Sequence, residues 1–514
     1  MKVNEILQQI SFGESIAEFE AEKLKDYFLK TEYWKQVRNG TNDVIYGAKG
    51  AGKSAIYTSL MNDTDTLFDE GTLIVLAENP TGNTAFANLK NDPPTSQTEF
   101  IRLWKLYFLV ITANVLNDYS IDDENARKIK QILIDCDLIP AQNKLSSFFK
   151  SCYDFVRSIL NGKEVSTTAE FDMAGNYAGQ KFSMTFGEPS KSDFDKGLIP
   201  IEHVYELLTK CLIENNIKLW IIIDRLDVAF PESEELETNA LRALFKTYLD
   251  LASFEEIKIK IFLRDDIWGK ISDSGFREAS HITKSQHISW SRDTLLNMII
   301  RRFLDNDFIV KLYNLDKDSI LSSIDEQEKL FYKFFPQQID VGSRKLNSLE
   351  WILSRTRDGK SVNTPREVIQ LLNHAKTIEL KKLETGINDL GKSDLLLSRS
   401  AIKEAFTSVS KQRMEQTIYA EYPTLKPMIE ALRGDKAEHT LNTLTPKWNK
   451  SNIETSTIIK KLVDIGFFET IGILPNQRYK IPFIYRPFLE IIQGKAYTGL
   501  SVDYEEEDGD EENE

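Results

Sequence analysis

The residues whose types and spacing indicate chemistry most directly form the segment GAKGAGKS, which ends at Ser54. Its pattern of Gly47, four residues, then Gly52 and Lys53 is that of a phosphate-binding P-loop. The backbone N–H groups around Gly47, Gly50 and Gly52 can turn toward phosphate oxygens because glycine tolerates the required conformations. We expect the Lys53 ammonium to contact the β- and γ-phosphates of ATP and the Ser54 hydroxyl to ligate Mg²⁺.

A second acidic part of the site is expected after the apolar run 218–223, KLWIII, which reads as a buried parallel strand. Asp224 follows this run, and we assign its carboxylate to Mg²⁺; the alternative is an ordinary strand end capped by an aspartate. Asp227 is the candidate for polarising an attacking water. Arg225 stands where many ATPases carry the catalytic acid, which predicts slow hydrolysis.

Two arginines are candidates for contacting the terminal phosphate. The run 257–263 alternates as a strand and is followed by Arg264, at the strand end where parallel sheets bind ligands. The alternative is an ion pair with one of the next two aspartates. The segment 363–369, NTPREVI, predicts a helix start with proline in its first turn, from which Arg366 would project. Its alternative is a surface arginine that pairs with Glu367 or with a neighbouring residue.

The elements that must position these residues suggest an α/β fold with added parts. Before the loop, 16–29 predicts an amphipathic helix, and 44–46, 72–78 and 286–290 predict further core strands. The segment 231–253 predicts a helix. Five regions are expected: an N-terminal helical linker (1–40), a P-loop core (41–290), a helical lid (291–395), a winged-helix-like domain (400–497) and an acidic tail (498–514).

The core carries a long interruption over about residues 90–200. Helical patterns cover 100–116, 122–137 and 144–160, and a Gly/Ser/Thr-rich stretch over 166–190 has hairpin character. Because loops of this length normally carry their own structure or function, we interpret the interruption as a helical insertion with a β-arm.

The C-terminal region predicts two helices, 420–432 and 454–464, and two short strands, 466–470 and 478–482, around a turn. Helix, helix and hairpin in this order are typical of a winged helix. Six cations are candidates for contacts with DNA phosphates: Lys447, Lys450, Lys460, Lys461, Arg478 and Lys480. The alternative is a protein-docking or autoinhibitory winged helix. The acidic body and tail and the modest local basicity favour protein docking over DNA contact.

Composition limits the remaining possibilities. The chain has 514 residues, three widely spaced cysteines and five scattered histidines, which indicate neither a disulfide framework nor a His/Cys metal site. Eight of its fifteen excess negative charges lie in the last ten residues, so the body is only mildly acidic. No apolar run reaches the ~20 residues that span a bilayer. A cytoplasmic protein without membrane contact is expected.

The order of these parts resembles the AAA+/STAND superfamily, and in particular origin-recognition-like and KAP-like bacterial P-loop ATPases. The P-loop, WIIIDRLD, FLRDD, HISW and TPREV carry the resemblance. It implies an α/β P-loop NTPase core with an AAA+-like parallel sheet, a lid and a winged helix. The opening FGES is similar to a bacterial group often associated with phage-defence islands. In AAA+ relatives an arginine before the last core strand reaches the neighbouring subunit's γ-phosphate, which suggests Arg277; its alternative is a loop arginine beside Glu278.

Three functions follow as hypotheses. The first is a slow Mg²⁺-dependent ATPase that switches assembly, as a homo-oligomer or with a protein effector, in bacterial anti-phage defence. The second is an origin-recognition-like ATPase that binds DNA through its winged helix. The third is a nucleotide-binding scaffold that does not hydrolyse ATP, which the departure at Arg225 supports.

Overall fold

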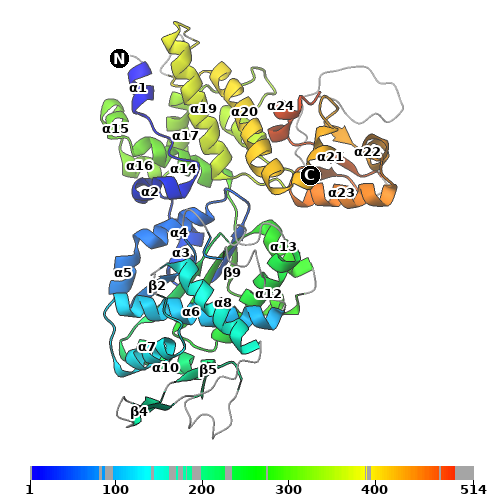
Figure 1. Ribbon diagram of the computed structural model, residues 1–514. Helices are drawn as coiled ribbons and strands as arrows, with labels where there is room; N and C mark the ends of the chain where they lie inside the picture. Colours follow the sequence, from blue (N-terminus) through cyan, green and yellow to red (C-terminus); the bar gives the residue numbers. More distant parts are fainter. Residues whose placement is uncertain are drawn as a thin grey trace. The chain divides into compact units, whose positions relative to one another are not determined.

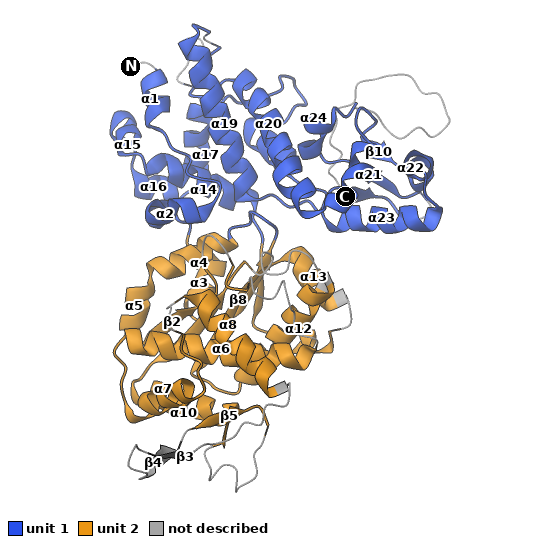
Figure 2. Ribbon diagram, viewed as in Figure 1, with its two compact units in different colours: residues 1–29, 48–52, 289–514 blue, residues 30–47, 53–288 orange. Residues whose placement is uncertain are grey.

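The computed structural model describes residues 3–79, 84–86, 96–140, 144–160, 169–171, 177–180, 182–187, 198–225, 234–273, 276–387, 389–390, 395–473 and 476–492. Contacts divide the chain into two compact units, coloured separately in Figure 2. Unit 1 comprises residues 1–29, 48–52 and 289–514, and unit 2 comprises residues 30–47 and 53–288. The predicted linker over 1–40 is therefore shared between the two units.

A five-stranded parallel sheet forms the centre of unit 2 (Figure 1). Its strand order is β2-β7-β8-β1-β9, where these are Thr72–Leu76, Lys218–Ile223, Ile257–Arg264, Val44–Gly47 and Ser285–Ile288. Each neighbouring pair is parallel. β7 is buried along LWIII, as expected for a strand covered on both faces. All five strands lie where the sequence predicts them, to within two residues.

Helices surround this sheet and include those of the insertion. They are α3 (Glu32–Arg38), α4 (Lys53–Asn62), α5 (Thr64–Asp69), α6 (Gln97–Asp118), α7 (Glu124–Asp135), α8 (Leu145–Leu160), α10 (Ile201–Glu214), α12 (Glu234–Leu251), α13 (Asp265–Asp273) and the 3₁₀ turn η3 (Arg277–His281). α6 packs against α12, α8 and β2. Trp104 of α6 donates to the Ala240 carbonyl at 3.0 Å, and Tyr107 donates to the Ala77 carbonyl at 2.8 Å. The first insertion helix is thus part of the core itself.

The predicted β-arm forms two small pairings. β3 (Ala169–Phe171) and β4 (Tyr177–Gln180) are antiparallel, as a hairpin requires. β5 (Ser183–Thr185) instead pairs in parallel with β6 (Leu198–Pro200), directly before α10.

A buried cation anchors the start of β1. Lys260 of β8 is fully buried; its ammonium donates to the Asn42 carbonyl at 2.9 Å and lies 3.3 Å from the Asp43 carboxylate. Burial lowers the pKa of Lys260 to about 8, against the attraction of Asp43. The ammonium also lies 4.2 Å from the centre of the Trp220 ring. These contacts bind β8 to the residues that lead into the P-loop strand.

Unit 1 contains the N-terminal helices, the helices of the predicted lid and the long helix that follows the lid. They are α1 (Val3–Gln9), η1 (Ala17–Glu20), α2 (Ala21–Tyr27), α14 (Arg292–Leu304), α15 (Asp307–Tyr313), α16 (Lys317–Leu321), α17 (Ile324–Phe334), α18 (Ser348–Thr356), α19 (Pro365–Glu384) and α20 (Arg399–Arg413). The single helix predicted over 16–29 is wrong in detail, because a 3₁₀ turn precedes α2. Buried Glu20, at this junction, accepts from Tyr27 and pairs with Arg302 of α14.

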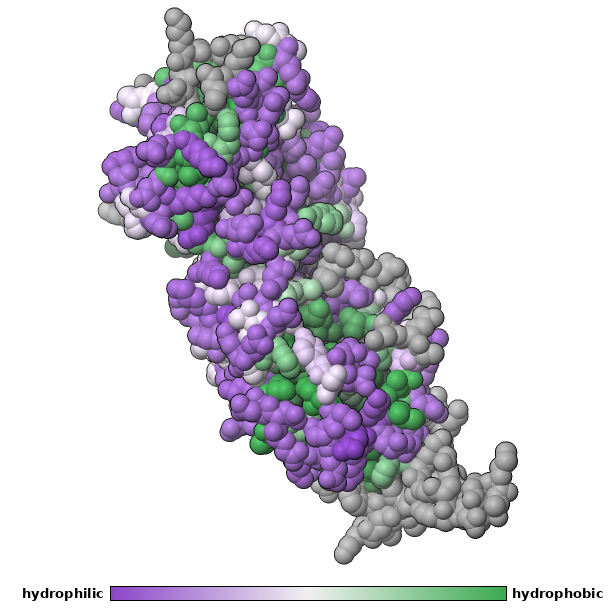
Figure 3. Space-filling view, turned by 90° about the vertical axis from the view of Figure 1, so that its left-hand side faces the viewer, coloured by the Kyte–Doolittle hydropathy of each residue, from purple (hydrophilic) through white to green (hydrophobic). Residues whose placement is uncertain are grey.

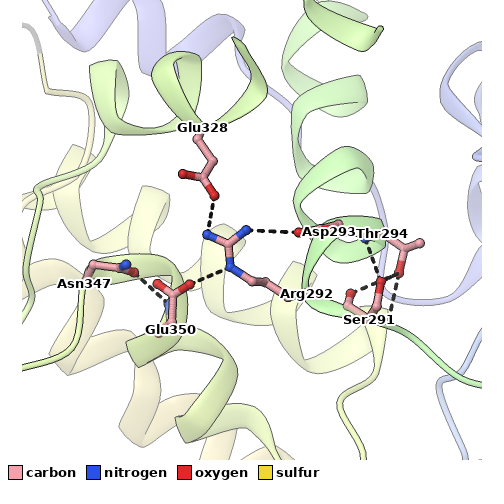
Figure 4. Close-up of polar contacts among 7 residues, drawn as sticks. All are labelled: Ser291, Arg292, Asp293, Thr294, Glu328, Asn347 and Glu350. Carbon is pink, nitrogen blue, oxygen red and sulfur yellow. Dashed lines mark hydrogen bonds and ion pairs between the residues drawn. The ribbon is translucent and has the colours of Figure 1, made fainter. Parts of the chain in front are cut away.

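A charged cluster joins three lid helices (Figure 4). Arg292, the first residue of α14, donates to Glu350 of α18 at 2.6 Å and to Asp293 at 3.0 Å. Its other terminal nitrogen pairs with Glu328 of α17. Ser291 caps α14 through a capping box with Thr294, which fixes the helix start from which Arg292 projects. One guanidinium therefore links the first turns of α14 and α18 to the middle of α17.

Arg292→Ala should lower the free energy of unfolding by about 1–2 kcal/mol, because it removes several charge-assisted hydrogen bonds from a partly exposed network. The loss should shrink in 1 M NaCl, since salt screens exposed charges. Urea unfolding with and without salt measures both effects. Lys329→Ala, which removes an exposed pair with Glu326, is the control and should change little. An equal loss in both variants would contradict the network.

The C-terminal part of unit 1 contains a small sheet and short helices. Its elements after α20 are the π-helical segment η4 (Met414–Tyr419), η5 (Pro423–Leu425), α21 (Lys426–Glu430), β10 (Glu438–His439), α22 (Leu441–Trp448), α23 (Asn452–Asp464), β11 (Glu469–Ile471), β12 (Arg478–Lys480), η6 (Phe483–Tyr485) and α24 (Arg486–Leu489). The helix predicted over 420–432 is wrong: Pro423 and Pro427 lack the N–H groups of a continuous helix. The sheet order is β10-β12-β11, with antiparallel pairing.

The surface carries scattered apolar side chains. Ile134 on α7 and Ile213 on α10 are 47% and 57% exposed. Figure 3 shows one face, on which hydrophilic residues (purple) are interspersed with hydrophobic ones (green). Among the described residues, every helix is too short or too polar to cross a lipid bilayer. The predicted acidic tail, 498–514, lies outside the described residues.

Candidate nucleotide site

The P-loop leaves β1 at Gly47 and enters α4 at Lys53. Gly50 and Gly52 have φ values of +86° and +98°, which residues with a side chain rarely adopt. A Cβ on Gly50 would lie 2.8 Å from the Cβ of Arg366 and 2.9 Å from the hydroxyl of Thr364. The positive φ therefore favours glycine at position 52. At position 50 the positive φ and the lack of room for a Cβ both favour it.

The predicted phosphate and metal ligands in unit 2 lie at the carboxyl ends of β1 and β7. Lys53 is buried, and its ammonium donates to the Gly47 carbonyl at 2.7 Å. The Ser54 hydroxyl donates to the Asp224 carboxylate at 3.2 Å, and Asp224 is 6% exposed. The structure thus brings together the two predicted oxygen ligands, which come from distant parts of the chain. A hydroxyl and a carboxylate suit Mg²⁺, which prefers oxygen ligands and keeps several waters.

The residue after Asp224 has an unusual backbone. Arg225 has φ +58°, a left-handed conformation that costs energy for a residue with a side chain. Its guanidinium donates to the Asn79 carbonyl at 3.0 Å, just beyond the end of β2. Asp227, predicted to polarise water, lies outside the described residues.

A carboxylate that the sequence analysis gave no role lies nearby, after β2. Glu78 is 1% exposed and accepts from the Thr84 hydroxyl at 2.6 Å and from the Ala85 N–H at 2.9 Å. Burial raises its pKa, while these hydrogen bonds and Arg225 oppose the shift. The signal was present, because the predicted strand 72–78 ends in this glutamate.

Arg264 is the last residue of β8 and forms the ion pair with a following aspartate that the sequence analysis gave as its alternative. Its guanidinium forms two hydrogen bonds of 2.9 Å with the Asp266 carboxylate. A role as a phosphate sensor would require this pair to rearrange, and it stays a prediction.

Within unit 1, Arg366 lies beside the P-loop. It follows Pro365, the first residue of α19, as the TPREV pattern predicts. Its Nε donates to the Ser15 carbonyl at 3.3 Å, and its side-chain carbons approach Gly50. Glu367 is turned away into a buried pair with Arg413, so the alternative of a surface pair between Arg366 and Glu367 is not what the structure has.

Two further loop contacts were missed by sequence reasoning. Trp290 Nε1 donates to the Ala51 carbonyl at 2.8 Å, immediately before α14. Lys49 pairs with Glu421, beyond the end of α20. Neither contact has a local sequence signal, because each joins residues more than two hundred positions apart.

The remaining candidates are exposed or have other partners. Arg277 is exposed at the start of η3, and the carboxylate of Glu278 pairs with Lys246. Three of the C-terminal cations are paired with acids: Lys447 with Asp435, Lys450 with Glu454 and Arg478 with Glu438. Lys460 and Lys461 are exposed on α23. The trans-acting arginine and the winged-helix DNA contact both stay predictions.

A parallel sheet whose interior strand β1 leads through a glycine-rich loop into α4 defines the fold as that of an α/β P-loop NTPase. No protein-family model and no curated protein sequence matches the chain.

Among solved structures, the chain is similar to the ORC2 protein of Aeropyrum pernix. The structure of its ADPNP–ADP complexes shares 12% sequence identity with this chain. The match covers 92% of this chain and 91% of that chain, with a TM-score of 0.39. Its ADP form is 13% identical, with the same coverage and a TM-score of 0.30. These scores are too low to establish a relationship, and the fold assignment rests on the sheet and the loop.

Proposed function

We propose that this protein is a Mg²⁺-dependent ATPase that works as a slow nucleotide-controlled switch. The observation that carries the proposal is the contact between Ser54 and Asp224. It joins the first turn after the P-loop to the end of β7, which β8 separates from β1 in the sheet, where P-loop proteins hold the metal of a nucleotide.

Each residue has a distinct task in this proposal. Lys53 would leave the Gly47 carbonyl and contact the β- and γ-phosphates, while loop N–H groups near Gly50 and Gly52 bind phosphate oxygens. Ser54 would hold Mg²⁺ directly and Asp224 through water. The metal, when bound, would neutralise charge on the transferred phosphate. Asp227 is proposed to polarise the attacking water, and Arg264 and Arg366 to contact the γ-phosphate.

Asp224→Asn should weaken Mg²⁺-dependent ATP binding by about 10- to 100-fold, because a neutral amide holds the metal and its waters less well. Calorimetric titration of ATP with Mg²⁺ and with EDTA separates the metal-dependent part. Asp250→Asn removes a carboxylate from α12 of the same unit and is the matched control. Wild-type affinity and wild-type Mg²⁺ dependence in Asp224→Asn would contradict the proposal.

The output of the switch is proposed to be contact with a protein, either an effector in bacterial defence or further copies of this chain. Pairing of three C-terminal cations supports protein docking over DNA, since paired cations release few counterions from DNA. Ile453 on α23 is 81% exposed, as an apolar contact for a protein would be. The exposure of Arg277 supports a role toward a second copy.

A further inference from the structure

The third residue of the P-loop, Lys49, is held by a part of unit 1 far along the chain. Its ammonium forms an ion pair with the Glu421 carboxylate and donates to the Gln416 carbonyl at 3.3 Å. The side chains of Lys49 and Glu421 are 30% and 16% exposed. The pair is therefore partly shielded from water, and it is still accessible to a competing ligand.

Glu421 occupies a junction in unit 1. Helix α20 runs on into the π-helical segment η4, which contains Gln416, and Glu421 follows just before Pro423 of η5. A π-helical turn is less favourable than an α-helical one and is frequent at functional sites. The contact thus joins the P-loop to the segment that leads from the lid into the C-terminal sheet.

A second contact holds the same stretch of loop. Gly50, the next residue, lies against Thr364 and Arg366 at the start of α19. In addition, Trp290 binds the Ala51 carbonyl. Three consecutive loop residues are therefore each in contact with a different segment of the C-terminal half of the chain.

A ligand that replaces Glu421 as the partner of Lys49 must carry more negative charge than a carboxylate. A carboxylate brings one negative charge, whereas the polyphosphate of a nucleotide brings several and also binds the neighbouring loop N–H groups. A partly exposed ion pair contributes little to stability, so a bound triphosphate is sufficient to displace it. A diphosphate, with less charge, competes less well.

We propose that Lys49 is an additional phosphate ligand and that Glu421 is an autoinhibitory carboxylate that occupies it when no triphosphate is bound. ATP takes Lys49 from Glu421 and releases the loop from η4, whereas ADP leaves the pair largely formed. This inference rests on the proposed function, because it requires nucleotide to bind the P-loop. The exchange of Lys49 from Glu421 to phosphate is the event by which the nucleotide site signals to the C-terminal part of unit 1.

Glu421→Gln tests the inhibitory role, since it removes the competing charge and keeps the size of the side chain. We expect ATP to bind about three- to tenfold more tightly, as expected when a closed state that excludes ligand is removed. Glu415→Gln is the matched control: it lies in η4, and its partner Lys411 is 4.0 Å away on the same helix. Equal ATP affinity in Glu421→Gln and the control would overturn the inference.

Lys49→Ala tests the phosphate contact separately. It also opens the pair, so a lysine that only holds Glu421 would give the tighter binding of Glu421→Gln. A lysine that binds phosphate should instead give weaker ATP binding and a smaller preference for ATP over ADP. Tighter binding in Lys49→Ala would overturn the assignment of Lys49 as a ligand.

Hydrogen exchange of the wild-type chain needs no variant. Peptides over 414–425 should exchange faster with a non-hydrolysable ATP analogue than with ADP. Unchanged exchange with the analogue demonstrably bound would overturn the release. If the wild type binds nucleotide no better than Lys53→Ala does, the proposed function itself fails. This result differs from one in which the wild type binds nucleotide but Glu421→Gln leaves the affinity unchanged, which overturns only the further inference.

Discussion

Lys53→Ala should lose at least about a hundredfold in ATP affinity, because it removes the one full charge that the P-loop pattern places on the β- and γ-phosphates. Lys53 is 8% exposed, so its ammonium acts where water screens it little. We expect the fold to survive, since a hydrogen bond that is lost goes to the Gly47 carbonyl at the start of the same loop. Titration calorimetry with Mg²⁺ and ATP measures the loss.

Lys35→Ala provides the control for Lys53→Ala. Lys35 lies on α3 of the same unit with 60% of its side chain exposed, in a surface pair with Glu32. Its removal should leave ATP affinity unchanged. A Lys53→Ala chain that melts like the wild type and still binds ATP with wild-type affinity would show that the loop is not the nucleotide site.

Arg413→Met should be the most destabilising single change considered, at about 3–5 kcal/mol, because it leaves buried carboxylates without their cation. Arg413 donates to Glu367 at 2.7 Å and lies 3.7 Å from Asp358. The three side chains are 8%, 3% and 10% exposed. Glu367 follows Arg366, so the cluster also fixes the start of α19. Urea unfolding followed by tryptophan fluorescence measures the loss.

The deficit of Arg413→Met should depend on pH. Burial already raises the pKa of Asp358 above its usual value, and loss of Arg413 should raise it further. The folded variant then binds more protons than the unfolded chain, so its unfolding free energy rises as the pH falls. The difference from wild type should therefore be smaller at pH 5 than at pH 7. Lys411→Met, an exposed change two residues away, should show neither the loss nor the pH effect.

Features set by local patterns could be predicted from the sequence. The run 218–223 is apolar because β7 is covered on both faces, and glycine, lysine and serine at 47–54 mark the loop. Pro365 marks the start of α19 for a similar reason. Each of these features depends on residues close together in the chain.

Features set by distant contacts could not be predicted. The helix expected over 420–432 is a different case, because the two prolines that interrupt it are a local signal that the prediction did not take into account. The pair of Lys49 with Glu421 joins residues 372 positions apart, and no local pattern distinguishes this glutamate from other acidic residues. The insertion was separated from the core in the prediction because amphipathic periodicity does not say against what a helix packs. In the structure, α6 packs on β2 and α12.

The strand order has a consequence for how the chain is made. β1 is synthesised before any other strand of the central sheet, yet its two neighbours, β8 and β9, come more than two hundred residues later. At five to twenty residues per second, the ribosome needs on the order of ten seconds or more to supply the first of them. During that time the apolar strand Val44–Gly47 has no native partner on either edge. We therefore expect the emerging chain to depend on chaperones that shield apolar segments until β8 emerges.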